Sequence, residues 1–237
     1  MSTTRSILGF SIAAIFAVCS AGALAATGTV TQLSGTLSVK KADGSIRILS
    51  QKSAIENGDT LNTERDSYAQ IKFEDGAQLT LKPNTAVKID DFRFTEGRPQ
   101  EDSFLYNLVK GGLRAVTGIV GKRSKDKYQV TTATATIGIR GTTFAADDCV
   151  NNRTGDCAIL EPAVYVGVAD GEVAVRNGLG ELGLAAGQFG LIAPNQRPLF
   201  LSTDPGLQFT PPATFIQSVM AGSTVNTGRS LECVITR

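Results

Sequence analysis

The strongest constraint in this chain is a period of two, because apolar and polar residues alternate in many short segments from Thr27 to about Pro198. Successive side chains of a strand point to opposite faces of a sheet, so this alternation predicts strands with one buried face. Glycine, aspartate and asparagine separate the segments, as they do at turns. The pattern therefore predicts an all-β domain of short strands. The clearest segments are residues 30–33, 36–39, 46–49, 68–73, 79–82 and 86–94.

One turn is well specified and one segment is ambiguous. Glu74-Asp75-Gly76 stands between two alternating segments, which is typical of a hairpin in which Asp-Gly supplies the positive φ. In residues 99–112 the apolar residues fit either one short helix or a strand at a sheet edge. The pattern alone does not decide between these two.

A weak internal repeat suggests how the strands are arranged. Gly35-Thr-Leu-Ser-Val39 and Gly171-Glu-Val-Ala-Val175 share a glycine that leads into a strand, and residues 112–116 form a third copy that is out of phase. Recurrent strand-turn units of this size can stack as a β-solenoid or roll. The alternative is a β-sandwich, in which the recurring glycines mark the turns of ordinary hairpins. We favour the solenoid-like or roll-like arrangement.

The N-terminus has the pattern of a secretory signal peptide. Arg5 supplies the positive charge, an apolar run follows, and Ala23-Leu24-Ala25 fits the cleavage pattern. A transmembrane anchor is the alternative, but the apolar stretch is short and lacks flanking stop-transfer charges. We expect a periplasmic or secreted protein with no stable membrane insertion after cleavage. The expected divisions are a signal peptide at 1–25, a β-domain at 27–193 and a proline-rich extension at 194–237.

The C-terminal extension differs in composition from the β-domain, because it is rich in proline. Residues 213–221 fit one short helix that begins after Pro211-Pro212, and a disordered tail is the alternative. We therefore expect this end of the chain to be a short irregular or helical segment.

The composition excludes several classes of function. The chain has no histidine, which removes Ser-His-Asp and Cys-His nucleophile systems and all imidazole metal ligands. It has 23 basic and 22 acidic residues, whereas nucleic-acid-binding domains usually carry a clear basic excess. No carboxylate pair for glycoside hydrolysis and no phosphate-binding loop stands out. We therefore expect no catalytic residue, no cofactor, no metal site and no nucleic-acid partner.

Three cysteines lie beyond the expected signal peptide. Cys149 and Cys157 are separated by seven residues in a loop-like stretch, and in an oxidising compartment they are a candidate disulfide. Closing so short a loop should add about 2 kcal/mol to stability. Cys233 has three options, because it can be free, pair with another chain, or displace one of the other two.

Two charged segments have alternative interpretations. The Asp and Asn residues of 147–156 could bind calcium, but their spacing does not match an EF-hand loop. The basic run at 122–127 could meet an anionic polymer or a membrane surface. We favour a solvated loop in both cases.

Three stretches of the chain carry a family resemblance. The first joins Gly35-Thr-Leu-Ser-Val39 to residues 57–63, the second covers 67–85, and the third covers 131–144. The combination resembles the FecR domain, the periplasmic domain of ferric-citrate-type signal transducers. The resemblance extends from Val30 to about Val175, and it implies a binding or signalling module.

The resemblance does not cover all parts of such transducers. Those proteins have a cytoplasmic anti-sigma segment and one membrane span where this chain has a cleavable signal, and a small α/β domain for which residues 199–237 are too few. The chain resembles a stand-alone exported FecR-domain protein, which leaves its partner open.

The resemblance also points to a candidate structural or partner-binding motif. Arg140 could clamp a carboxylate or phosphate of a ligand or partner with two hydrogen bonds. Alternatively, it pins a neighbouring coil through carbonyl groups or an acidic residue such as Asp75, and we favour this structural role. The residues of the motif are Asp75, Gly76, Gly138, Arg140, Gly141 and Thr142.

Taken together, the sequence predicts a non-enzymatic, exported FecR-domain protein that binds an envelope protein or a glycan. The alternative is a periplasmic regulator in iron- or siderophore-type transmembrane signalling to an extracytoplasmic sigma factor.

Overall fold

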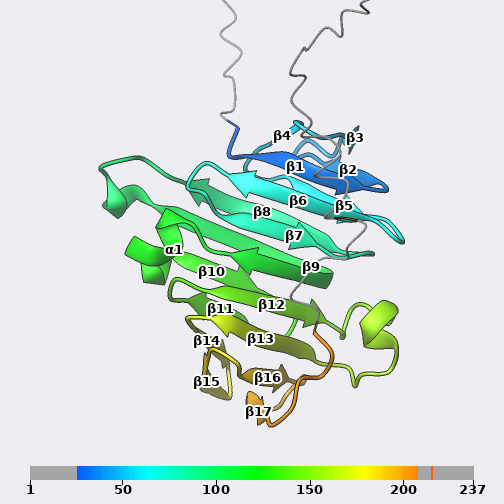
Figure 1. The fold of residues 1–237 in the computed structure, drawn as a ribbon, viewed down its shortest axis with the longest axis vertical. Helices are drawn as coiled ribbons and strands as arrows, with labels where there is room; N and C mark the ends of the chain where they lie inside the picture. Colours follow the sequence, from blue (N-terminus) through cyan, green and yellow to red (C-terminus); the bar gives the residue numbers. More distant parts are fainter. Residues whose placement is uncertain (1–25, 208–214, 216–237) are drawn as a thin grey trace, which may run out of the picture.

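The computed structural model describes residues 26–207 and Phe215, and it contains one connected sheet of 17 strands that folds into two layers (Figure 1). Layer A runs in the order β4 (Ala54–Ile55), β1 (Gly28–Ser34), β6 (Tyr68–Phe73), β7 (Gln78–Leu81), the second part of β9 (Ser103–Val116), β12 (Thr143–Asp148), β13 (Val164–Asp170), β16 (Phe189–Ile192) and β17 (Leu199–Leu201). Layer B runs in the order β3 (Ile46–Leu49), β2 (Leu37–Lys40), β5 (Thr60–Thr63), β8 (Ala86–Arg93), the first part of β9, β10 (Tyr128–Thr131), β11 (Thr136–Ile139), β14 (Glu172–Asn177) and β15 (Gly180–Ala185).

Strand β9 joins the two layers. Residues 103–110 pair with β8, and residues 104–107 also pair with β10, all within layer B. Residues 111–116 pair with β12, and residues 113–116 also pair with β7, all within layer A. Gly111 stands at the change of layer with φ +82°, where a Cβ would overlap the backbone of Thr85. The ambiguous segment 99–112 is therefore a short 3₁₀ turn at Pro99–Glu101 followed by a strand.

The core lies between the layers and is built from the inward-facing residues of both. An aromatic group fills its centre, where the rings of Phe73 and Phe104 are 4.5 Å apart between centroids. The hydroxyl groups of Tyr106 and Tyr128 are 3.4 Å apart, so these two buried polar groups have each other as partners. Because the inward face of each strand is apolar, the alternation in the sequence is explained by burial on this side.

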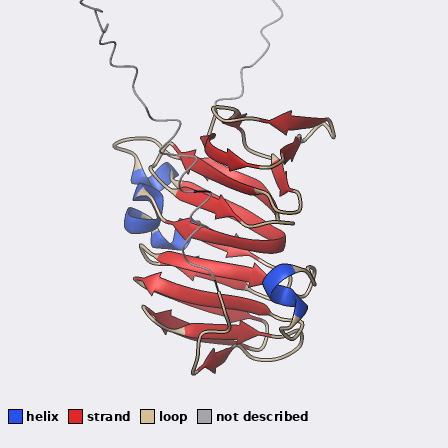
Figure 2. Ribbon diagram, turned by 45° about the vertical axis from the view of Figure 1, so that its right-hand side comes forward, coloured by secondary structure: helices blue, strands red, loops and turns tan. Residues whose placement is uncertain are grey.

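The structure confirms the all-β class. Apart from Phe215, which is helical, the helical residues that the structure describes lie in α1 (Ile119–Arg123) and three 3₁₀ turns, η1 (Pro99–Glu101), η2 (Lys125–Lys127) and η3 (Gly155–Ala158) (Figure 2). The basic run at 122–127 forms the end of α1 and η2. All strand pairs are antiparallel except β9 with β10, and the solenoid-like arrangement of stacked coils is not confirmed.

Three of the sequence-based expectations fall partly or wholly outside the described residues. The signal peptide at 1–25 and Cys233 lie outside them, and of the helix expected at 213–221 only Phe215 is described. Phe215 is buried and packs on Tyr68 of β6, with 5.8 Å between the ring centroids. Strand β17 pairs with β16, so strand pairing continues into the expected extension. Within the described residues, no helix is both long and apolar enough to span a bilayer.

Candidate functional site

The segment 140–142 forms a corner where the chain passes from β11 in layer B to β12 in layer A. The N–H of Thr142 donates to Oγ1 of Thr117 at 2.8 Å, and the Thr142 hydroxyl donates to the carbonyl of Glu172 at 2.8 Å. Gly141 has φ +67°, and its carbonyl lies where a Cβ of Gly171 would be. The backbone of residues 140–142 is therefore held in place by contacts within the domain.

The side chain of Arg140, in contrast, makes few contacts within the domain. It is 61 % exposed, and its contact with the carboxylate of Glu172 spans 4.0 Å, at the limit of an ion pair. Among the described residues its guanidinium donates no hydrogen bond. Arg140 forms no ion pair with Asp75, whose carboxylate accepts the N–H groups of Ala77 and Val120, so a structural role of Arg140 through carbonyl groups or an acidic residue stays a prediction. An exposed contact of this length adds little to stability.

Asp75 and Gly76 belong to the β6–β7 turn, where they support α1. The Asp75 carboxylate accepts the N–H groups of Ala77 at 2.9 Å and Val120 at 3.1 Å, and its carbonyl accepts the N–H of Ile119. Burial raises the pKa of the Asp75 carboxyl. Gly118 must be glycine, because a Cβ there would overlap this carboxylate. These two motif residues have structural roles.

Gly138 lies in the floor of a trough on the outer face of layer B. It is in register with Ala174 of β14, which is in register with Gly183 of β15. Three adjacent strands therefore present no long side chain over a width of about 10 Å. This space forms a hollow of ≈ 340 Å³, which continues over Gly183 as a second hollow of ≈ 300 Å³. We call this feature the trough.

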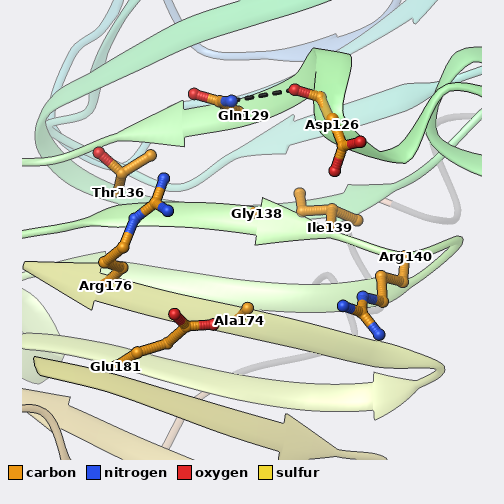
Figure 3. A pocket seen from close by; sticks show the side chains of 9 residues that line it. All are labelled: Asp126, Gln129, Thr136, Gly138, Ile139, Arg140, Ala174, Arg176 and Glu181. Atoms are coloured by element: carbon orange, nitrogen blue, oxygen red, sulfur yellow. Dashed lines mark hydrogen bonds between the residues drawn. The ribbon is translucent and has the colours of Figure 1, made fainter.

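Charged side chains form the two walls of the trough (Figure 3). Arg176 and Glu181 are opposite each other in β14 and β15 on one side, and Arg140 and Glu172 stand on the other. Neither Arg176 nor Glu181 forms an ion pair within 4.0 Å with any residue that the structure describes. The trough thus offers a ligand the guanidinium groups of Arg140 and Arg176 and the carboxylates of Asp126, Glu172 and Glu181. This arrangement suits a polar partner that carries both signs of charge or a carboxylate.

Sequence reasoning found Arg140 and Gly138 but missed Arg176 and Glu181. Arg176 lies two positions after Ala174 in β14, and Glu181 lies two positions before Gly183 in β15. Residues two positions apart in a strand share a face, so each pair lies on one side of the sheet. This signal was present in the sequence. The register that brings β11, β14 and β15 together was not.

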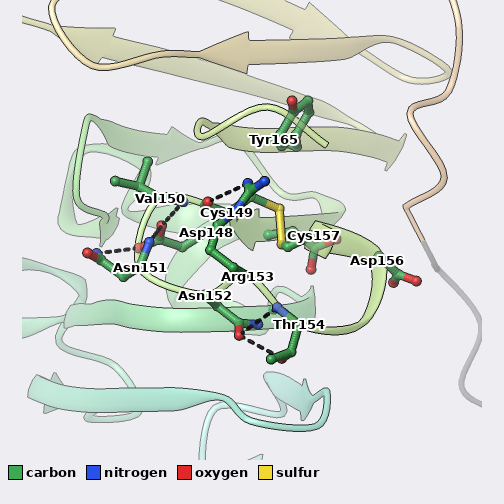
Figure 4. The surroundings of a disulfide bond; sticks show 12 residues. Asp148, Cys149, Val150, Asn151, Asn152, Arg153, Thr154, Asp156, Cys157 and Tyr165 are labelled. Atoms are coloured by element: carbon green, nitrogen blue, oxygen red, sulfur yellow. Dashed lines mark hydrogen bonds between the residues drawn. A yellow bond between two sulfur atoms is a disulfide. The ribbon is translucent and has the colours of Figure 1, made fainter. Parts of the chain in front are cut away.

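A disulfide closes the loop that follows β12 (Figure 4). Cys149 and Cys157 are joined by a disulfide with 5.0 Å between their Cα atoms. The Asp148 carboxylate accepts the N–H groups of Val150 and Asn151, so it shapes this loop. In the described part of the chain, no three Asp, Glu or Cys residues are placed to hold a metal ion.

The loop also brings Asp156 to a buried ion pair. Nζ of Lys82 is 2.8 Å from a carboxylate oxygen of Asp147 and 3.2 Å from one of Asp156. Burial raises the pKa of the Asp147 carboxyl. Sequence reasoning missed this cluster, because Lys82 and Asp147 are 65 residues apart and carry no local pattern.

Comparison with known proteins identifies the domain. Residues 59–174 match the family model described as "FecR protein". No curated protein matches the chain.

The solved structures provide weaker likenesses. Two crystal structures of "a putative anti-sigma factor" from Parabacteroides distasonis have TM-scores of 0.47 and identities of 14% and 15%, covering 62% of this chain and 60% of theirs. A structure described as "Cell surface anchoring domain" has a TM-score of 0.27 and 28% identity, covering 27% of this chain and 84% of that one. The chain spans about 60% of the length of the two Parabacteroides proteins.

Proposed function

Because this chain carries a FecR domain over residues 59–174, we propose that it is a regulatory binding module of the cell envelope and not an enzyme. One observation carries the proposal. In residues 140–142, which lie in one of the stretches that carry the family resemblance, the backbone and Thr142 form hydrogen bonds within the fold, whereas the guanidinium of Arg140 is exposed beside the trough. A side chain that the fold does not use is available to a partner.

The proposed partner is an envelope protein that places an extended acidic segment in the trough. A carboxylate of that segment would accept paired hydrogen bonds from Arg140 or Arg176. The carboxylates of Glu172 and Glu181 would accept N–H groups of its backbone. The floor of Gly138 and Ala174 allows the backbone to approach closely. A glycan is the other candidate partner, and we favour a protein because the lining has both signs of charge and no aromatic ring.

Crosslinking in cells tests this proposal. The full chain with a C-terminal tag is produced in its native host, crosslinked, and purified with its partner for mass spectrometry. We expect Arg140→Ala to capture less of a protein that the wild-type chain captures. The double variant Arg140→Ala/Arg176→Ala should capture none of it. The control is Arg47→Ala, which removes an exposed arginine from β3 of the same layer, remote from the trough.

Two results would contradict the proposal. Capture of the same proteins by the wild-type chain and the double variant would exclude the trough as the binding site. A large fall in the Tm of Arg140→Ala would show that Arg140 is structural after all. If the double variant captured the same proteins as the wild type but no longer bound purified envelope glycan, the partner would be the glycan.

The FecR match also favours a second candidate function, which is regulation of an extracytoplasmic sigma factor in iron- or siderophore-type signalling. This role would act from the periplasm, through a membrane protein that the chain contacts. A reporter for such a sigma factor tests it. A reporter whose response is the same with and without this gene would exclude the signalling role.

A further inference from the structure

The outer face of layer A contains a row of residues in which a lysine reaches an aspartate across an intervening strand. Lys82 follows β7 and its N–H donates to the carbonyl of Gly112 in β9, and Gly112 is in register with Asp147 of β12. The lysine side chain passes over Gly112, and a Cβ there would overlap both the Asp147 carboxylate and the Lys82 chain. Glycine in the middle of a strand is unfavourable by about 0.5–1 kcal/mol. Here it makes the contact possible.

The pair is shielded from water. The side chains of Lys82 and Asp147 are 12% and 3% exposed. Tyr165 is in register with Asp147 on the next strand, and Tyr68 lies beside Lys82 in the lining of the same pocket. An ion pair buried in this way gains little net stability, because the cost of removing both charges from water offsets their attraction. Stability alone therefore does not account for the arrangement.

A third group completes the cluster. The carboxylate of Asp156 is 3.2 Å from Nζ of Lys82 and is 45% exposed. It is carried by η3 inside the disulfide-closed loop, which is also held by a hydrogen bond from Asn84 to Thr154. The lysine nitrogen thus touches one buried carboxylate, which can be the acceptor of a covalent bond, and one carboxylate in contact with solvent, which can relay protons.

We propose that Lys82 and Asp147 condense after folding to an intramolecular amide that crosslinks β7 to β12. Nζ gives one proton to the Asp147 carboxylate, and the neutral amine that results attacks Cγ of Asp147. As the C–N bond forms, Asp156 takes a second proton from the nitrogen and passes it to the departing oxygen. The bond from Cγ to one carboxylate oxygen breaks as the new C–N bond forms. One proton of the original ammonium stays on the amide nitrogen, and the other two leave with that oxygen as water. No oxidant, reductant or cofactor is required.

The geometry provides what this reaction needs. Burial raises the pKa of the Asp147 carboxyl, so its neutral acid form is less disfavoured than it is in water. Holding the reacting groups in contact raises their effective concentration by several orders of magnitude. The product would join two strands that are not neighbours, across β9.

The mass of the intact protein tests the proposal. The full chain is purified from its native compartment, treated with a reductant so that the disulfide does not alter the mass, and measured unfolded. We expect a mass lower by one water than that calculated for the sequence from the N-terminal residue that N-terminal sequencing of the same sample identifies, and a proteolytic product in which the peptide with Lys82 is joined to the peptide with Asp147. Lys82→Arg keeps the cation and should have the full mass of its sequence.

Two further variants make the test chemically specific. Asp147→Asn should form the same crosslink with loss of ammonia in place of water, because the leaving group is then an amide nitrogen. Asp156→Asn should lower the crosslinked fraction at least tenfold at a fixed time after synthesis. A wild-type chain that is folded, has the full mass of its sequence and yields a free Lys82 peptide overturns the proposal, whatever the variants do. An unchanged crosslinked fraction in Asp156→Asn removes Asp156 from the mechanism.

Discussion

The Asp75 carboxylate in the β6–β7 turn accepts the N–H of Val120 at 3.1 Å, and this bond ties layer A to the first turn of α1. At the other end of the helix, Arg123 donates two hydrogen bonds to the Asp102 carboxylate, at 2.6 Å and 2.8 Å. A helix of five residues is unstable by itself. These two carboxylates therefore hold α1, and through it the connection from β9 to β10.

We expect Asp75→Ala to destabilise the protein by about 2 kcal/mol, because the buried N–H groups of Ala77 and Val120 lose their acceptor. Asp75→Asn keeps one acceptor oxygen and should cost less. Urea unfolding followed by circular dichroism measures both. The control is Asp90→Ala, which removes an exposed carboxylate that pairs only with Lys88. Equal stability of Asp75→Ala and the control would show that the turn does not support α1.

The Arg123–Asp102 contact predicts a pH dependence. The hydrogen bonds from Arg123 lower the pKa of the Asp102 carboxyl in the folded state. The folded protein therefore holds the ionised form more strongly than the unfolded chain does, so this stabilisation is complete above the unfolded pKa of about 4 and is lost as the pH falls through the folded value.

Asp102→Asn tests this dependence. We expect the variant to be less stable than the wild type at pH 7, and the difference in unfolding free energy to shrink as the pH falls from 5 towards 3. Unfolding in urea at a series of pH values measures it. A difference that stays constant over this range would show that the charge of Asp102 does not contribute.

Gly171→Ala should destabilise the corner at residues 140–142 by about 1–3 kcal/mol. Gly171 has φ +80°, and an added Cβ would approach the carbonyl oxygen of Gly141 to 2.5 Å. Gly183→Ala is the matched control, because nothing lies within 4 Å of a Cβ at that position. Thermal unfolding measures both variants. Similar Tm values for the two would show that the corner tolerates the displacement.

Removal of the disulfide should cost about 2 kcal/mol, because the loop between Cys149 and Cys157 then gains entropy in the unfolded chain. We expect the wild type in reductant to unfold at the same urea concentration as the double variant Cys149→Ala/Cys157→Ala. A wild type whose unfolding midpoint does not change in reductant, under conditions that reduce the bond, would contradict the expectation.

Local patterns were enough to predict the β6–β7 hairpin. The segment from Tyr68 to Leu81 has alternation on both sides of an Asp-Gly turn, and all the information for that pairing is contained in neighbouring residues. Strand β9 was ambiguous, because Gly111-Gly112 interrupts its alternation and Phe104 and Leu108 are spaced as on a helix. It is a strand because it has hydrogen-bonded partners on both sides in each layer, and those partners are remote in the chain.

The candidate sites were predictable to a smaller extent. Arg140 stood out because its motif resembles a family, but its role required the exposed surroundings that the structure shows. Arg176 reaches the trough only through the register of β11 with β14. The contact between Lys82 and Asp147 depends on two successive registers across β9. Register between distant strands is set by the packing of the entire core, which no single segment encodes.

All strand pairing between the first half of the chain and the second half passes through β9, since β7 and β8 lie on one side of it and β10 and β12 on the other. Without β9, each half would have an unpaired strand edge in both layers, at β7 and β8 on one side and at β10 and β12 on the other. The two halves of the described structure are therefore joined into one folding unit by a single strand.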